Sequence, residues 1–201
     1  MNPSKLTSVQ GKQQGYTLVE LAISVAILSV LIVAGLLGVQ AILTSGKVND
    51  QIKTVAKLSA KSSALFASKG TSGVSQQQMI NVGAWDASKA NKDGKVTSSF
   101  GSAETLETNS TAIGTNGAMA LNTGFVYKIN AVPQAACADL ANGLSGFVFA
   151  LHVTTVSGAA PTGDWTTGTT AVKAPGAANV TLSTLADNCN SNSDFYMAIK
   201  P

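Results

Sequence analysis

The sequence predicts an α+β fold in which a long N-terminal helix carries an antiparallel β-sheet on its C-terminal half and leaves its apolar half protruding. Three observations lead to this prediction. An uninterrupted apolar stretch lies near the N-terminus, an amphipathic helical pattern follows it, and segments of alternating apolar residues gather in the C-terminal part. The length of 201 residues suits one ordinary domain with some additional chain.

The composition excludes several classes of function. Charged residues make up only 11% of the chain and the mean hydropathy is +0.22, so a disordered chain is not expected. All 13 basic residues are lysines spread along the chain, which disfavours nucleic-acid binding through arginine forks or basic patches. With two cysteines and one histidine, we expect neither a metal site nor a cofactor.

The apolar stretch is long enough to cross a membrane. No charged residue lies between Glu20 and Lys47, and residues 21–39 contain only two serines as polar interruptions. A helix of this length spans about 28 Å, close to the hydrocarbon thickness of a bilayer. Lys5 and Lys12 precede the span, and flanking lysines stay on the cytoplasmic side. The chain from Lys47 onward is therefore expected to face outward.

The segment before the span is polar and ends at Gly15. A secretory signal peptide places its apolar run before the cleavage site, whereas a cut after Gly15 leaves the apolar helix on the mature chain. Glu20 lies one turn inside the helix, where a carboxylate is costly and usually has a partner. Two interpretations remain open: a pairing role for Glu20, or an acid at the headgroup boundary that also suits a helix N-terminus.

Residues 15–21, Gly-Tyr-Thr-Leu-Val-Glu-Leu, together with the apolar run, resemble the processing site of type IV prepilins. The resemblance implies that a prepilin peptidase and methylase cleaves between Gly15 and Tyr16 and methylates the new amine of Tyr16. It also implies that Glu20 assists the assembly of subunits into a filament. The chain departs from the family pattern at Tyr16, where phenylalanine is common, and at Leu37, where many members carry proline.

Gly35 and Gly38 flank the position of that missing proline. Glycine costs a helix about 1 kcal/mol relative to alanine. These residues either mark a stretch that unwinds in filaments or permit close helix packing, and both interpretations stay open.

Beyond the span, apolar and small residues recur every three or four positions, as in a helix with one face on a core. They are Val48, Ile52, Val55, Leu58 or Ser59, Ser62, Leu65 and Phe66. Lys53, Lys57 and Lys61 form a separate row that is expected to be solvated. One helix is therefore predicted over residues 17–68, with the Lys-Gly pair at 69–70 as its stop signal.

Residues 71–122 are rich in Gly, Ser, Thr and Asn, so loops and short strands are expected there rather than a core element. Asp93-Gly94 is a turn signal against which Trp85 is expected to pack. The turn is only faintly similar to a calcium loop, because the terminal glutamate is missing.

The C-terminal part shows the strand signals. Alternating apolar residues predict strands over residues 124–132 and 147–153. A short helix is expected between them over residues 133–144, with proline at its permitted first position. Residues 180–185 and 195–199 are expected to add two further strands, which completes an antiparallel sheet on the long helix.

Cys137 and Cys189 enclose much of this region. An even pair of cysteines in a body that faces outward predicts a disulfide. The arrangement resembles the cysteine-bounded region of type IV pilins, and residues 132–137, Val-Pro-Gln-Ala-Ala-Cys, with Leu140 following, resemble the type IVb branch. The mature length, 201 minus 15, or 186 residues, also suits that branch.

The expected organisation has a cleaved leader at 1–15 and a transmembrane and filament-core half of the helix at 16–46. The amphipathic half at 47–70 packs on the body. Residues 71–201 form a globular head that contains the disulfide-bounded region 137–189.

The function that the resemblance implies is that of a structural subunit of an extracellular type IV pilus, supporting adhesion, aggregation or related surface functions. The precursor is expected in the inner membrane and the mature chain in a surface filament, with other pilin subunits and the pilus assembly machinery as partners. A minor or adhesive tip subunit and a pseudopilin of a type II secretion system are the alternatives. An enzyme is not expected, because no catalytic constellation is evident and His152 has no identifiable catalytic neighbour.

Overall fold

A computed structural model describes residues 16–66, 70–114, 118–163, 165–166 and 170–201. The chain divides into two compact units, Met1–Ile42 and Leu43–Pro201. The helix α1, Leu18–Phe66, contributes to both units. The second unit contains all the other helices and strands and is called the head unit below.

The helix α1 is continuous from Leu18 to Phe66, which confirms the prediction of one long helix. Its N-terminal boundary lies one residue later than predicted, and residues 67–69 lie outside the described residues. The amide of Gly70 donates to the Phe66 carbonyl at 3.1 Å. Gly70 has a φ of +71°, the left-handed conformation that glycine adopts after a helix.

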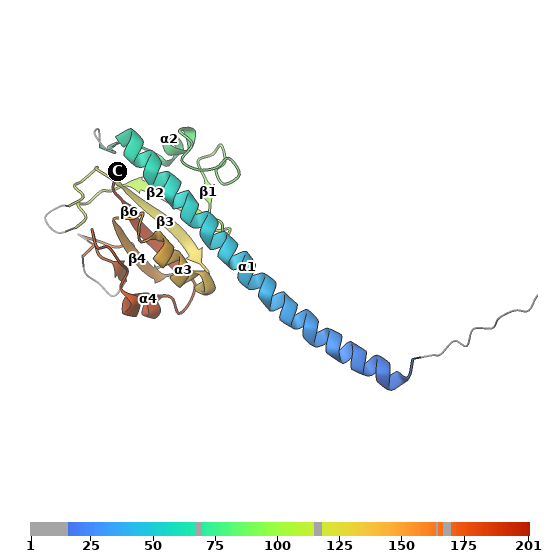
Figure 1. The fold of residues 1–201 in the computed structure, drawn as a ribbon. Coiled ribbons are helices and arrows are strands. Elements are labelled where there is room, and N and C mark those ends of the chain that lie inside the picture. The colour runs from blue at the N-terminus through green and yellow to red at the C-terminus, as the bar shows by residue number, and fades with distance from the viewer. Residues whose placement is uncertain (1–15, 67–69, 115–117, 164, 167–169) are drawn as a thin grey trace, which may run out of the picture. The chain divides into compact units, whose positions relative to one another are not determined.

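Six strands form one sheet in the order β1-β2-β3-β6-β4-β5, and all neighbours are antiparallel. The strands are β1 Val96–Thr97, β2 Ala103–Thr108, β3 Phe125–Val132, β4 Ala150–Thr155, β5 Ala171–Lys173 and β6 Ser193–Ile199. The C-terminal strand β6 lies between β3 and β4, with Met197 opposite both Tyr127 and Leu151 (Figure 1). The middle of the sheet is therefore completed only by the end of the chain.

One face of the sheet packs on the C-terminal half of α1 and on α3, Gln134–Leu144 (Figure 1). Val55 and Leu58 of α1 join Phe125, Tyr127 and Phe195 in one buried cluster. The alternation that predicted β3 places Phe125 and Tyr127 on this inner face. This packing confirms the predicted sheet on a helix.

The opposite face of the sheet, called the outer face below, carries a smaller buried cluster. It consists of Ile113, Met119, Ala150, Trp165, Tyr196 and Ala198. Loop residues such as Met119 and Trp165 thus cover sheet residues such as Tyr196. Both faces of β6 are buried as a result, since all seven of its residues are buried.

The strand predicted over residues 180–185 is wrong. This segment forms the helix α4, Leu182–Asn188, with Leu185 buried. A short apolar pattern fits a helical turn as well as a strand, and tertiary packing decides between them. Only the amide of Thr181 reaches the sheet edge, where it donates to the Val172 carbonyl at 2.6 Å.

Residues 71–122 contribute more to the core than the sequence predicts. They contain α2, Gln76–Asn81, which begins with a capping box at Ser75, and the sheet strand β2. Met79 and Trp85 are buried in the main cluster. The predicted turn at Asp93-Gly94 is present, since Gly94 has a φ of +79°.

Two boundaries near α3 also differ from the prediction. Pro133 is the N-cap residue of α3, with extended backbone angles, rather than its first helical residue. β4 begins at Ala150, and Phe147, expected in that strand, is 43% exposed.

Candidate functional site

The apolar half of α1 is exposed on every side. All described residues from 16 to 43 are exposed, and Leu31 and Leu37 keep 62% and 64% of their surface. A helix that is apolar all round belongs in a bilayer or in the interior of an assembly. The helix is long and apolar enough to cross a membrane. This half of α1 therefore requires lipid or protein neighbours beyond this single chain.

The polar residues of this half differ in how they are satisfied. Ser24 Oγ donates to the Glu20 carbonyl at 2.8 Å, and Ser29 Oγ donates to the Ala26 carbonyl at 2.7 Å. The amide of Glu20 lies 3.3 Å from Thr17 Oγ1. The carboxylate of Glu20, in contrast, has no hydrogen-bond or ionic partner within the described part of the chain. It is the one charged group on this apolar surface.

Of the two residues that flank the predicted cleavage position, the structure describes only Tyr16. Gly15 and the leader lie outside the described residues, whereas Tyr16 is 84% exposed at the start of the described chain. Tyr16 precedes α1 by two residues, and Glu20 lies in the first turn of that helix. Tyr16 and Glu20 therefore both lie at the N-terminal end of α1, where both are exposed.

Gly35 and Gly38 lie within the continuous helix, and a Cβ at either position would meet no atom within 4 Å. The two interpretations of these glycines, local unwinding and close packing, both concern neighbours in an assembly. They stay predictions.

The C-terminal half of α1 is joined to the sheet by a buried polar cluster. Gln51 Nε2 donates to Glu104 Oε1 of β2 at 2.6 Å, and Trp85 Nε1 donates to Glu104 Oε2 at 3.1 Å. Ser99 donates its amide to Gln51 Oε1 at 2.9 Å. Glu104 is 2% exposed, and this burial raises the pKa of its carboxyl group.

A second set of contacts holds the chain after α2 against α1. Lys89 Nζ lies 2.7 Å from Asp50 Oδ2 and donates to Thr54 Oγ1 at 2.8 Å. The hydrogen bond from Lys89, and a second from Ser99, lower the pKa of Asp50. Lys57 pairs with Asp86 at 2.6 Å, so this lysine of the predicted solvated row is also a tether.

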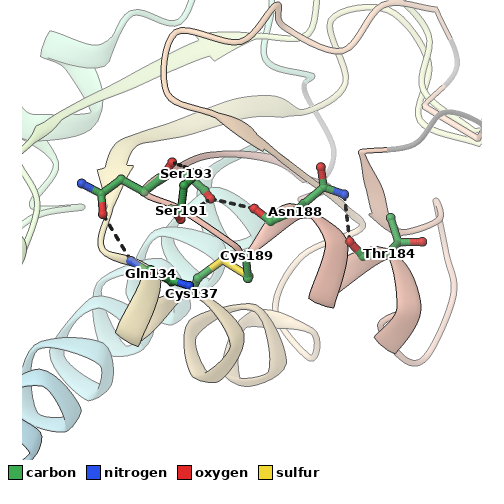
Figure 2. The surroundings of a disulfide bond; sticks show 8 residues. Gln134, Cys137, Thr184, Asn188, Cys189, Ser191 and Ser193 are labelled. Carbon is green, nitrogen blue, oxygen red and sulfur yellow. Dashed lines mark hydrogen bonds between the residues drawn. A yellow bond between two sulfur atoms is a disulfide. The ribbon is translucent and has the colours of Figure 1, made fainter.

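Cys137 and Cys189 form a disulfide with a Cα–Cα distance of 5.6 Å (Figure 2). Cys137 is buried on α3, and Cys189 is the C-cap residue of α4. Ser193 Oγ at the start of β6 donates to the Asn188 carbonyl at 2.8 Å beside the bridge (Figure 2). The bridge therefore holds α4 to α3 at the point where the chain enters the central strand β6.

His152 is a buried structural residue of β4. Its Nδ1 lies 3.1 Å from Thr170 Oγ1, and its Nε2 lies 3.3 Å from the Trp165 carbonyl. Burial lowers the pKa of the imidazole. No carboxylate among the described residues contacts the ring, so the imidazole lacks the acid that would orient it as a catalytic base. His152 therefore supports the packing of the outer face through Thr170 and Trp165.

The polar residues that join the elements were not predicted from the sequence. Gln51 follows Val48 by three positions on the buried stripe of α1, so its place in the helical pattern was a usable signal. Glu104 lies two residues before buried Leu106 and therefore on the same face of β2, so its burial could also have been predicted. Buried Asp194 and Lys173 gave no such signal, because their partners lie in distant parts of the chain, in β3 for Asp194 and after α3 for Lys173.

Comparison with known proteins matches the N-terminal part of the chain to one family model. Residues 10–36 match the prokaryotic N-terminal methylation motif, which spans the predicted cleavage position and the start of α1. No curated protein sequence matches the chain.

Two solved structures match most of the chain. The crystal structure of a type IVb pilin from Salmonella typhi is similar with a TM-score of 0.50 at 17% identity, covering 76% of this chain and 99% of that chain. The crystal structure of TcpA, a type IV pilin from the El Tor biotype of Vibrio cholerae, gives a TM-score of 0.45 at 18% identity, covering 81% and 99%.

The chain thus combines a prokaryotic N-terminal methylation motif at the start of a long apolar helix with an antiparallel sheet on the second half of that helix. The fold is that of a type IVb pilin, as the residues around Cys137 predicted.

Proposed function

We propose that the chain is cleaved between Gly15 and Tyr16 and that the mature product polymerises through α1 as the structural subunit of a type IV pilus. The observation that carries this proposal is the apolar half of α1, which is exposed on all sides and bears a single unpaired carboxylate. Lipid covers this surface before assembly, and the same surface of other subunits covers it in the filament.

Polymerisation through apolar contact alone leaves the position of a subunit unspecified. Lipid tails are as apolar as leucine, so transfer of the helix from lipid to a filament core gains little hydrophobic energy. A buried carboxylate, in contrast, strongly favours a cationic partner in surroundings of low polarity. Pairing of the Glu20 carboxylate with a cation therefore supplies the interaction that fixes the position of a subunit during assembly.

Cleavage creates the partner for Glu20. The new amine of Tyr16 is the only cation that the mature sequence contains before Lys47. The prepilin peptidase and methylase makes and methylates this amine, and the methylated amine keeps its positive charge. A pair between Glu20 of one subunit and Tyr16 of the next neutralises both charges and sets the axial offset between subunits. A pair within one chain would form if the helix extended back to Tyr16, because residues 16 and 20 would then be one helical turn apart.

The alternatives of a minor tip subunit and a pseudopilin gain no separate observation from the described residues. The other predicted partners, namely the assembly machinery and further pilin subunits, follow from polymerisation. The proposed assembly uses each predicted part: the leader at 1–15 is removed, the half of the helix at 16–46 enters the filament core, and the half at 47–70 carries the head at 71–201.

The test compares Glu20→Ala and Glu20→Gln with wild type in the intact chain. We expect normal cleavage, measured as the N-terminal mass of the membrane-bound chain, but little sheared filament. Ser24→Ala is the matched control, since Ser24 is polar, lies one turn away and is already satisfied by its own helix. Wild-type filament yield from Glu20→Ala alone would contradict the proposed role, and intact precursor in the wild type would contradict cleavage after Gly15.

A further inference from the structure

A pocket of about 310 Å³ opens on the outer face of the sheet. Its floor is formed by outward-facing residues of β2, β3 and β6, namely Thr105, Glu107, Val126, Lys128 and Tyr196. Its sides come from Thr108 at the end of β2 with Ser110 and Thr111 after it, and from Ala160, Pro161 and Trp165 after β4. One wall is therefore rich in hydroxyl groups and the other is mainly apolar.

Side chains of the sheet fix the apolar wall in place. Tyr196 Oη donates to the Gly158 carbonyl at 3.1 Å, and the amide of Ser157 donates to Asp194 Oδ2 at 3.2 Å. His152 Nε2 lies 3.3 Å from the Trp165 carbonyl. Ser157 and Trp165 have φ angles of +63° and +61°, which cost non-glycine residues energy and persist where surrounding contacts enforce them. The wall is thus preformed.

The pocket has unused hydrogen-bonding capacity. The side chains of Thr105, Thr108 and Glu107 make no hydrogen bond or ion pair with the described part of the chain. Trp165 is only 3% exposed, yet its indole N–H has no partner there either. Every fully buried side-chain nitrogen or oxygen that the structure describes is hydrogen-bonded, so this N–H is not fully buried. It is a further hydrogen-bond donor on a residue that lines the pocket.

The charges of the pocket select among ligands. Lys128 Nζ lies 3.1 Å from buried Asp194 and 4.9 Å from the centre of the Tyr196 ring, so its charge is already compensated. Glu107 is exposed and unpaired, and it gives the pocket a net negative character. Phosphates, nucleotides and acidic sugars are therefore disfavoured.

We infer that this pocket binds a neutral hexopyranose. Such a sugar presents hydroxyl groups around its edge, which suit the threonine hydroxyls, the Glu107 carboxylate and the Trp165 N–H. Its ring also has apolar C–H faces, which suit Val126, Ala160 and Pro161. The volume is at the lower end of the range for small-molecule sites and fits a ligand of this size. The inference concerns the head unit and does not depend on polymerisation.

The test uses the full-length chain in a polyoxyethylene detergent, which carries no sugar headgroup. Saturation-transfer NMR is recorded with the methyl glycosides of glucose, galactose, mannose and N-acetylglucosamine, and with N-acetylneuraminic acid as the anionic probe. We expect transfer to at least one neutral glycoside with a Kd on the order of 1 mM. We expect no transfer to the anionic sugar.

The variant T105V/T108V removes two hydroxyls at nearly constant shape and should weaken binding about tenfold, which corresponds to about 1.4 kcal/mol. Thr97→Val is the matched control, because Thr97 is an exposed strand threonine outside the pocket. It should leave the Kd unchanged. No transfer to any neutral glycoside, equal transfer to N-acetylneuraminic acid, or an unchanged Kd in T105V/T108V would each overturn the inference.

Discussion

At the scale of single residues, the head unit is organised around buried charges that are satisfied in different ways. Asp194 accepts the amide of Ala131 at 2.8 Å and pairs with Lys128. Glu104 accepts two side-chain donors but has no cation in direct contact among the described residues. A buried carboxylate without a directly contacting cation carries a desolvation cost, and this cost makes the head sensitive to pH.

The pH dependence that we predict for Glu104 has a definite sign. Its pKa is raised in the folded head above the ordinary value of 4.5, so folding binds the proton more tightly. This contribution to stability is fully present below pH 4.5 and is lost as the pH rises through the raised pKa. Glu104→Gln should therefore reduce the decline of the unfolding free energy as the pH rises above 4.5, measured by urea denaturation.

Asp50 provides the control for this prediction, because its pKa is lowered from 3.8. Its contribution is present above pH 3.8 and is lost as the pH falls through the lowered pKa. Asp50→Asn should therefore alter only the acid limb of the stability curve. An unchanged slope above pH 5 in Glu104→Gln would refute the assignment to Glu104.

At the scale of elements, the helices are fitted to one another by small residues and by the disulfide. Gly143 on α3 faces Ile52 on α1, and a Cβ at residue 143 would lie 2.2 Å from Ile52 Cδ1 and 3.0 Å from Cγ1. The absence of a side chain at Gly143 therefore allows α3 to lie close to α1. Cys137 on the same helix then ties α3 to α4.

We predict that Gly143→Val destabilises the head by about 1–3 kcal/mol, because the new side chain overpacks against Ile52. Ile52→Ala removes the clashing atoms. The double variant should therefore be more stable than the sum of the two single effects allows, with a coupling of about 0.5–3 kcal/mol in a denaturation cycle. Strict additivity would show that the two residues do not compete for the same space.

Loss of the disulfide should free α4 from α3. The bridge closes a loop with a sequence separation of 52 residues. On the chain-entropy model such a loop contributes about 4 kcal/mol, so Cys137→Ser should lower the denaturation midpoint strongly. The double variant C137S/C189S should match the single variant. Equal midpoints for Cys137→Ser and wild type would contradict a stabilising role of the bridge.

At the scale of the whole molecule, the head unit buries its own apolar residues, whereas the apolar unit needs neighbours outside the chain to cover its surface. The head unit has its own core, and its buried residues begin at Val48. None of the described residues from 16 to 43 is buried. Stability therefore resides in the head unit, whereas the apolar unit serves interactions outside the single chain.

We predict that a chain beginning at Leu43 folds as a soluble monomer, since no described contact of the core is removed. Its urea midpoint should match that of the full-length chain in detergent, and light scattering should show no filaments. A large loss of stability would mean that residues before 43 support the head. Filament formation by this truncated chain would contradict assembly through the apolar helix.

The sequence by itself determined the elements whose signals are local. The apolar span, the Gly15–Tyr16 motif and Glu20 stand in one contiguous segment, and the methylation motif found there agrees with the prediction. The long helix, β3 and β6 have repeats of three to four residues or of two, which depend on neighbours in the chain. The pair Cys137 and Cys189 also needed no geometry, because only two cysteines exist.

The tertiary structure alone decided what depends on contacts between distant residues. Residues 182–188 became α4 rather than a strand, because Leu185 packs in the core and Cys189 bonds to α3. The short strands β1 and β5 exist only through pairing with their neighbours. Glu104 and the outer-face pocket combine residues from segments far apart in the chain. Local periodicity carries no information on such pairings, so only the folded chain specifies them.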